Sequence, residues 1–110
     1  MKRDMLEIAV QRADPDSDPV VVVAGEVDLS TAPRLRQTIL DLLAEEPPQG
    51  VRVDLAEVAL LDSTGVFVLV DTYKRAKGRG VGLTVEHPQQ IVRRVLEICG
   101  LLEILTEGSP

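Results

Sequence analysis

The sequence predicts an α/β fold: a mainly parallel central sheet with one antiparallel strand at its N-terminal edge, covered by helices. The 110 residues, 45% of them hydrophobic, suffice for one domain with one core, and we place that domain over residues 1–110. From residue 20 onward strand-like and helix-like segments alternate, which favours parallel strands joined by helical crossovers. A short turn just before residue 20 joins the first strand-like segment to the second. These two strands are therefore expected to pair antiparallel.

The first two strands are predicted from two different patterns. Residues 5–12 alternate apolar and polar side chains, as a half-buried strand does. Residues 13–19 are rich in Asp and Pro, which is typical of a turn. Residues 20–23 are consecutive valines, a pattern typical of a strand covered on both faces. We therefore expect an N-terminal hairpin whose second strand, residues 20–27, lies in the centre of the sheet.

The first helix is predicted to begin near Ser30 and Thr31. Either side chain can cap the free amide groups, and Pro33 is tolerated in a first turn. Apolar residues recur at helical spacing across residues 35–43, and a Pro-Pro pair at residues 47–48 ends the helix. This helix is expected to be amphipathic.

A strand, a helix and a further strand follow. Apolar residues alternate over 51–55, and a second apolar segment at 58–61 leads into a helix that begins at residues 62–65. That helix ends in residues 74–80, where cations in the last turn precede glycines. Residues 81–85 are predicted as the next strand.

The C-terminal part is predicted as a helix followed by a short strand. Pro88 opens the helix and Gly100 ends it. Residues 101–105 then form a short final strand, and residues 106–110 a tail. The inward face of this helix is predicted to consist of Ile91, Val92, Val95, Leu96 and Cys99.

Charge and composition exclude several classes of function. The net charge of −6 repels phosphate backbones, and only one Phe and one Tyr could stack on bases, so we expect no nucleic-acid partner. One cysteine and one histidine cannot build a structural zinc site, and we expect neither metal nor cofactor. Without a signal peptide or about 18 consecutive apolar residues, the chain is expected to be a complete cytoplasmic protein with no membrane insertion.

Two polar loops are expected at the carboxyl ends of strands, where parallel sheets place functional groups. One is residues 25–30, Gly-Glu-Val-Asp-Leu-Ser, and the other is residues 62–65, Asp-Ser-Thr-Gly. Asp, Ser and Thr are ordinary capping residues, so a purely structural role is one interpretation. One cap needs only one side chain, however. At least one hydroxyl of the second loop is therefore expected to face solvent, where a kinase could reach it.

A hydrolytic enzyme is not expected. A nucleophilic serine needs a base within hydrogen-bond reach, and the single histidine, His87, lies beside Pro88 at the start of the third predicted helix. The Gly-x-Ser-x-Gly motif is absent around Ser63. The glycine-rich residues 78–82 follow a helix and precede a strand, which indicates a turn rather than a phosphate-binding loop. The cations of residues 74–79 indicate a solvated face, or else a docking patch for an acidic partner or anionic lipid.

Three segments stand in a recognisable order along the chain. They are Gly25-Glu26-Val27-Asp28, Leu61-Asp62-Ser63-Thr64-Gly65 and Val95-Leu96-Glu97-Ile98-Cys99-Gly100-Leu101. Together they resemble the STAS domain of bacterial anti-sigma factor antagonists. The similarity covers nearly the whole chain, and the predicted order of strands and helices agrees with that fold.

The resemblance implies a phosphorylation-switched binding protein and not an enzyme. The unphosphorylated form would bind an anti-sigma factor, itself a serine kinase, and so free a sigma factor. Phosphorylation of Ser63 by that kinase would end the binding, and a metal-dependent serine phosphatase acting on phospho-Ser63 would restore it. Asp28 matches the family's acidic position beside the phosphorylation loop. The residues that the resemblance places in the partner surface are Asp28, Ser30, Asp62, Ser63, Thr64 and Gly65.

Two departures from the family and one alternative function stay open. Phe67 stands where family members often carry a small residue, and it either alters the partner surface or fills the core. Many members have a further C-terminal helix, whereas only residues 106–110 follow the predicted last strand here. A small STAS regulatory subunit of a membrane lipid transporter would share the fold and is the alternative function. Nucleotide binding at the two loops has little support.

Overall fold

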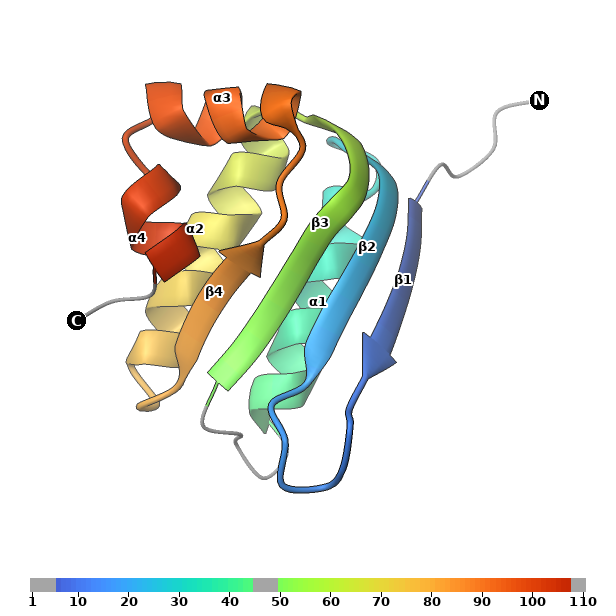
Figure 1. Cartoon of the computed structure of the whole chain (residues 1–110), viewed down its shortest axis with the longest axis vertical. Helices are drawn as coiled ribbons and strands as arrows, with labels where there is room; N and C mark the ends of the chain where they lie inside the picture. Colours follow the sequence, from blue (N-terminus) through green and yellow to red (C-terminus); the bar gives the residue numbers. More distant parts are fainter. Residues whose placement is uncertain (1–5, 45–49, 108–110) are drawn as a thin grey trace.

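The computed structural model describes residues 6–44 and 50–107, which form four strands and four helices (Figure 1). The order matches the predicted alternation as far as the third helix. The elements are β1 (Leu6–Gln11), β2 (Val20–Val27), α1 (Ala32–Ala44), β3 (Gly50–Leu61), α2 (Ser63–Lys77), β4 (Gly82–Glu86), α3 (Gln90–Ile98) and α4 (Leu102–Glu107).

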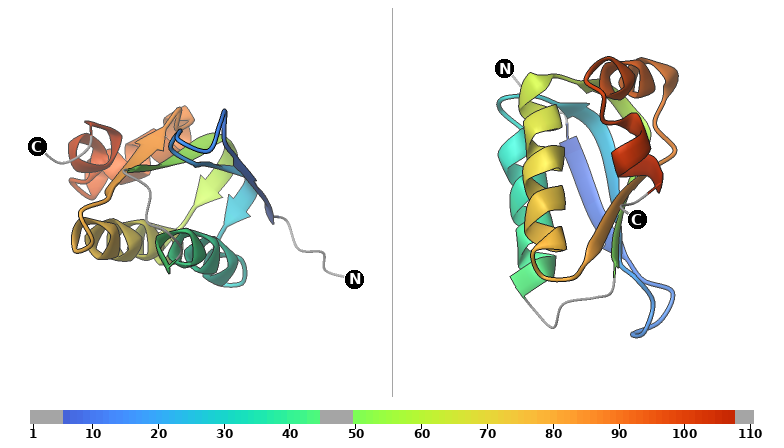
Figure 2. Two further views of the ribbon diagram at one scale, coloured as in Figure 1. Left: turned by 90° about the horizontal axis from the view of Figure 1, so that it is seen from below. Right: turned by 90° about the vertical axis from the view of Figure 1, so that its left-hand side faces the viewer.

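The strands form one sheet in the order β1-β2-β3-β4. β1 pairs antiparallel with β2, and the other two pairs are parallel, which confirms the predicted fold class and the central place of β2. The two faces of β2 differ in burial. Val21 and Val23 are fully buried, whereas Val20 and Val22 are half-buried. The expectation that both faces are covered is therefore wrong for one of them, because α3 and α4 lie beside β4 and the end of β3 and not over β2 (Figure 2).

The hydrophobic core lies between the sheet and a layer of two helices. α1 and α2 run side by side along one face, as the end-on view shows (Figure 2). Leu35 and Ile39 of α1 and Leu69 of α2 are completely buried against the sheet. The predicted amphipathic character of α1 is thus confirmed. Among the described residues, no helix combines the length and apolar character needed to cross a membrane.

The predicted final strand is wrong, because the segment after α3 is a helix. Gly100 has a φ of +73°, in the left-handed region that favours glycine, and it ends α3. The chain then continues as α4, in which Thr106 Oγ1 donates to the carbonyl oxygen of Leu102 and Leu105 is buried. Leu102 and Leu105 are three residues apart, a helical spacing that the short apolar run 101–105 did not make obvious. The described chain therefore has the C-terminal helix that the sequence analysis missed.

The inward face of α3 is narrower than predicted. Val92 and Leu96, four residues apart, are fully buried, whereas Ile91 is 57% exposed and Cys99 is exposed. Cys99 lies at the C-cap, where the chain leaves the helix, so it does not continue the buried stripe. The assignment of Ile91 and Cys99 to the core is therefore wrong.

The glycine-rich segment after α2 is a turn, as predicted. Gly78 is the C-cap of α2, and the Val81 amide donates to the Ala76 carbonyl at 2.9 Å. Gly80 has a φ of +75° and lets the chain reverse into β4. The Pro-Pro pair that was predicted to end α1 lies outside the described residues.

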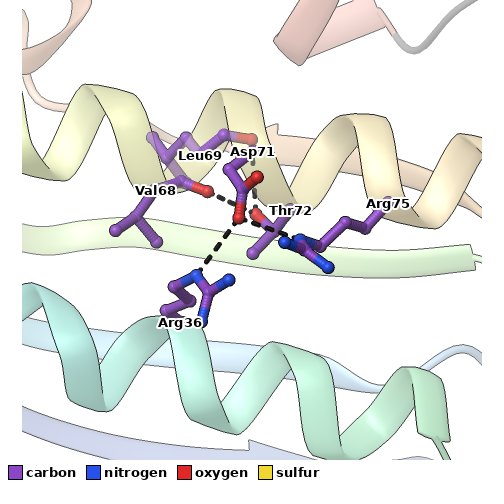
Figure 3. A network of polar contacts seen from close by, with 6 residues as sticks. All are labelled: Arg36, Val68, Leu69, Asp71, Thr72 and Arg75. Carbon is purple, nitrogen blue, oxygen red and sulfur yellow. Dashed lines mark hydrogen bonds and ion pairs between the residues drawn. The ribbon is translucent and has the colours of Figure 1, made fainter.

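An ion-pair network ties α1 to α2 on their outer side (Figure 3). One carboxylate oxygen of Asp71 accepts from Nε of Arg36 on α1 and from Nε of Arg75 on α2, both at 3.1 Å. Partial burial acts to raise the pKa of Asp71, but the hydrogen bonds and charges of the two arginines outweigh it and hold the pKa below 3.8. The network is therefore intact at neutral pH, and its contribution to stability is lost only in acid, as the pH falls through that lowered pKa.

Candidate functional site

The two polar loops meet because they follow neighbouring parallel strands. In the β2–β3 ladder Val27 pairs with Leu61, the last residue of β3. The amide of Asp62 donates to the carbonyl oxygen of Val27 at 3.1 Å, which holds the start of the second loop against the end of β2. Asp28 and Asp62 thus leave the sheet side by side. This juxtaposition, expected from the strand order, defines the candidate site.

The first loop is organised around the carboxylate of Asp28. Its Oδ1 accepts hydrogen bonds from the Ser30 amide at 3.0 Å, the Ser30 hydroxyl at 2.8 Å and the Thr31 amide at 3.2 Å. The hydrogen bond from the Ser30 side chain is the main reason why the pKa of Asp28 lies below 3.8. Asp28 is therefore a carboxylate at neutral pH, and it caps the turn that leads into α1. The sequence analysis had assigned this role to Ser30 or Thr31.

Thr31 is a buried support for the same loop. It is 3% exposed, its Oγ1 donates to the Glu26 carbonyl at 2.7 Å, and the same oxygen accepts from the Asp28 amide at 2.9 Å. One side chain thus joins the end of β2 to the start of α1. The sequence analysis considered Thr31 only as a helix cap, because spacing along the chain does not reveal a contact back to Glu26.

In the second loop, Asp62 is the N-cap of α2 and takes up the free amides. Its Oδ1 accepts from the Thr64 amide at 2.9 Å and the Gly65 amide at 3.1 Å. Ser63 is exposed and Thr64 is half-buried. Within the described part of the chain, neither hydroxyl has a hydrogen-bond partner. The Ser63 hydroxyl therefore faces solvent at the N-terminus of a fifteen-residue helix.

Gly65 lies under this surface and not on it. It is buried, and a Cβ atom at this position would come within 2.5 Å of Leu61 Cδ1 and 2.8 Å of Val27 Cγ1. The absence of a side chain thus lets the first turn of α2 sit against the ends of β2 and β3. This packing holds the first turn of α2, which begins at Ser63, against Val27, the residue before Asp28.

Two exposed apolar side chains border the site. Leu29 is 75% exposed and Phe67 is 65% exposed. Of the two roles left open for Phe67, filling the core is thus excluded. In the structure the inward positions of α2 are 65, 68, 69, 72 and 76, and position 67 lies off that stripe. The sequence analysis did not identify Leu29 as a residue of the partner surface.

Other chemistry is not assembled around Ser63. The single histidine, His87, has its Nδ1 3.6 Å from Asp54 Oδ1 in the middle of β3, so it does not serve Ser63 as a base. In the portion of the chain that the structure describes, no three His, Cys, Asp or Glu side chains gather where they could hold a metal ion. The arrangement suits recognition and modification of a hydroxyl.

Comparison with known proteins identifies the family. The model of a family described as "Mlab, STAS domain" matches residues 10–106. This chain belongs to the STAS domain family. An anti-sigma-B factor antagonist from Bacillus subtilis is 34% identical over 100 residues, which are 91% of this chain and 90% of that protein.

Solved STAS structures agree with the described fold. The crystal structure of an anti-sigma factor antagonist from Mycobacterium paratuberculosis has a TM-score of 0.70 at 35% identity, covering 87% of this chain and 79% of that one. SpoIIAA, a further anti-sigma factor antagonist, matches in its unphosphorylated form with a TM-score of 0.72 and in its phosphorylated form with 0.68, at 17% and 16% identity. At that identity the SpoIIAA comparison supports the STAS fold alone.

The structure allows the charge of Asp28 to be separated from its role in the loop. Because Asn keeps the Oδ1 acceptor, Asp28→Asn is expected to leave the melting temperature within a few degrees of wild type, roughly the effect of losing one surface charge. The loss of the negative charge should nevertheless weaken binding to a protein partner or slow phosphorylation of Ser63. Asp28→Ala removes the acceptor as well and should lower the melting temperature further. Thermal unfolding and partner titration measure the two effects; unchanged binding and phosphorylation in Asp28→Asn would rule out a functional role for the charge.

Proposed function

We propose that this protein is an anti-sigma factor antagonist that acts by binding and not by catalysis, with residues 1–110 forming one STAS domain. In its unphosphorylated form it binds an anti-sigma factor that is also a serine kinase, and a sigma factor is released. The kinase transfers the γ-phosphoryl group of ATP to Ser63 Oγ and ADP leaves. A serine phosphatase acting on phospho-Ser63 returns the protein to its binding form.

One observation carries the proposal: Ser63 is exposed while its neighbour Asp62 does the capping. A serine that capped the helix would have to break that bond before it could be phosphorylated. Here the hydroxyl is accessible without any change in the backbone. The matching relatives named anti-sigma factor antagonists, which extend over most of this chain, support the same function.

The helix N-terminus explains why the fold would tolerate the modification. Free amide groups and the helix dipole stabilise an anion at this end of α2. At the same time the phosphate adds about 1.5 to 2 negative charges next to Asp62, in the loop that lies beside the Asp28 loop. The modification would therefore leave the protein folded while changing the charge of the surface that a partner meets.

The partner can be identified by affinity capture from an extract of the source organism, with the wild-type chain and Ser63→Asp as paired baits. Wild type is expected to retain an anti-sigma factor with an ATP-binding serine kinase domain, and Ser63→Asp should retain much less of it. Mass spectrometry of the wild-type bait after incubation with the captured kinase and ATP should place phosphate on Ser63. Phosphate on another residue only, or equal capture by both baits, would contradict the proposal.

A regulatory subunit of a membrane lipid transporter is the second candidate function. Such a subunit would share the STAS fold, which the matching family model identifies over residues 10–106. The same capture experiment separates the two functions. Recovery of a transporter permease and its ATPase with both baits, without an anti-sigma factor, would favour the transporter function.

A further inference from the structure

Leu29 and Phe67 are exposed apolar side chains next to the polar residues of the site. Leu29 directly follows Asp28 in the loop between β2 and α1. Phe67 follows Ser63 by four residues on α2, so the two side chains lie on the same helix face, one turn apart. Because Val27 and Leu61 are paired and are followed by these two segments, Leu29 and Ser63 leave the sheet at neighbouring points. Leu29, Ser63 and Phe67, which we call the anchor surface, thus form one surface.

The ion-pair network joins the helix that carries Ser63 and Phe67 to α1. Asp71 lies one further turn along α2 from Phe67, and it bonds to Arg36 on α1 at 3.1 Å (Figure 3). The outer side of α2 that carries Ser63 and Phe67 is therefore held against α1, the helix that begins just after Leu29. Gly65 fixes the other side of the same turn against Leu61 and Val27. The backbone segments that carry Leu29 and Phe67 are thus both packed against the ends of β2 and β3 or tied to each other through α1.

A kinase that modifies Ser63 contacts the surface immediately around that residue. Phosphoryl transfer requires the reacting atoms to be about 3 to 3.5 Å apart, so the catalytic face of the kinase must contact the residues within a helical turn of Ser63. Large apolar side chains gain from being removed from water, and aromatic ones often dominate the binding energy of an interface. Leu29 and Phe67 are two of several exposed large apolar side chains of the described chain, and they lie in the loop and the helix that carry Asp28 and Ser63.

We propose that Leu29 and Phe67 are apolar anchors that insert into apolar pockets on either side of the active site of the serine kinase. This inference rests on the proposed function and adds the chemistry of the partner surface: two apolar pockets flank the point at which Ser63 enters. Leu29 and Phe67 provide binding affinity for the kinase, and phosphorylation of Ser63 prevents that binding.

The test compares Leu29→Ala and Phe67→Ala with Val10→Ala. Val10 is a matched control because it is 45% exposed and pairs with Val21 near the start of β2, at the opposite end of the molecule. Binding of each unphosphorylated variant to the kinase is measured by calorimetry, and Ser63 phosphorylation is followed by mass spectrometry. Leu29→Ala and Phe67→Ala should each bind about tenfold more weakly or worse, while Val10→Ala stays within about twofold of wild type. Circular dichroism should show the same fold in all three.

The outcomes separate this inference from the proposed function. If wild type binds the kinase and is phosphorylated on Ser63, but Leu29→Ala and Phe67→Ala bind as tightly as Val10→Ala, the anchors are refuted and the proposed function stands. If all three variants are weakened equally, the effect is not specific to the anchor surface and the inference is also refuted. If wild type fails to bind the kinase or to be phosphorylated on Ser63, both the anchor inference and the proposed function are refuted.

Discussion

Phosphorylation of Ser63 is expected to weaken binding to the anti-sigma factor on the order of a hundredfold. The modification places about 1.5 to 2 additional negative charges beside the Asp28 and Asp62 carboxylates, at a point that the partner must cover. Removing this concentrated charge from water without new cationic partners is costly, and about 2.7 kcal/mol suffices for a hundredfold loss.

Two substitutions at Ser63 mimic the unphosphorylated and the phosphorylated states of the protein. Ser63→Ala leaves the Asp62 cap intact and cannot be phosphorylated, so it should bind its kinase persistently in the presence of ATP. Ser63→Asp carries a negative charge at the same point and should bind poorly. Both should retain a native circular dichroism spectrum, because neither touches the core. Ser17→Ala is the control: it removes a hydroxyl in the turn between β1 and β2, far from the strand ends that carry Asp28 and Ser63, and this variant should still be phosphorylated on Ser63 and released.

Calorimetric titration of the kinase with phosphorylated and unphosphorylated protein measures the effect directly. Equal affinity of the two forms would show that the partner-switching mechanism is wrong for this chain. The same conclusion would follow if purified anti-sigma kinase and ATP left Ser63 unmodified while modifying Thr64.

Gly65→Ala is expected to destabilise the fold by about 1–3 kcal/mol, the usual cost of overpacking a filled site. In an open helix the same change would stabilise by up to about 1 kcal/mol, because Ala is the better helix former. Here the new methyl group would lie 2.5 Å from Leu61 Cδ1 and 2.8 Å from Val27 Cγ1, and both of those side chains are buried and cannot move into solvent. The clash therefore outweighs the helical preference.

The loss should appear as a melting temperature lower by about 4–8 °C per kcal/mol, measured by thermal unfolding. Because relief of the clash pushes the first turn of α2 away from the sheet, partner binding should weaken as well. Gly82→Ala is the control, since a Cβ atom there has nothing within 4 Å. It should change the free energy of unfolding by no more than about 0.5 kcal/mol. A melting temperature of Gly65→Ala equal to that of Gly82→Ala would contradict the packing role.

The polar loops show how far sequence reasoning reaches at the site. Their position at the carboxyl ends of adjacent strands followed from the alternation of segments and the topology of parallel sheets. The sequence did not indicate which side chain would cap each helix. Asp62, Ser63 and Thr64 are all acceptable caps, and the choice among them depends on the local backbone geometry. In the structure Asp62 is the N-cap of α2, Asp28 caps the turn that leads into α1, and the Ser63 hydroxyl is left to solvent.

The C-terminal part shows a limit of a different kind. Residues 101–107 are too short to display a clear period, so an apolar run there is compatible with a strand or a helix. The tertiary packing decides between a strand and a helix: Gly100 redirects the chain, and Leu105 packs into the core beside β4. The same applies to Cys99 and Ile91, whose apolar character suggested burial although α3 turns only Val92 and Leu96 inward.

By itself, then, the sequence determined the order and type of all but the last element, the antiparallel edge, the central place of β2, and the neighbourhood of Asp28 and Ser63. These depend on hydrophobic periodicity and chain connectivity, which are local or topological properties. Only the tertiary structure decided that Ser63 is unbonded, that Gly65 is a packing contact, and that Leu29 and Phe67 stand in water. Those outcomes depend on competition among side chains for the same amides and the same space, and that competition is settled only once α1, α2 and the strand ends are packed together.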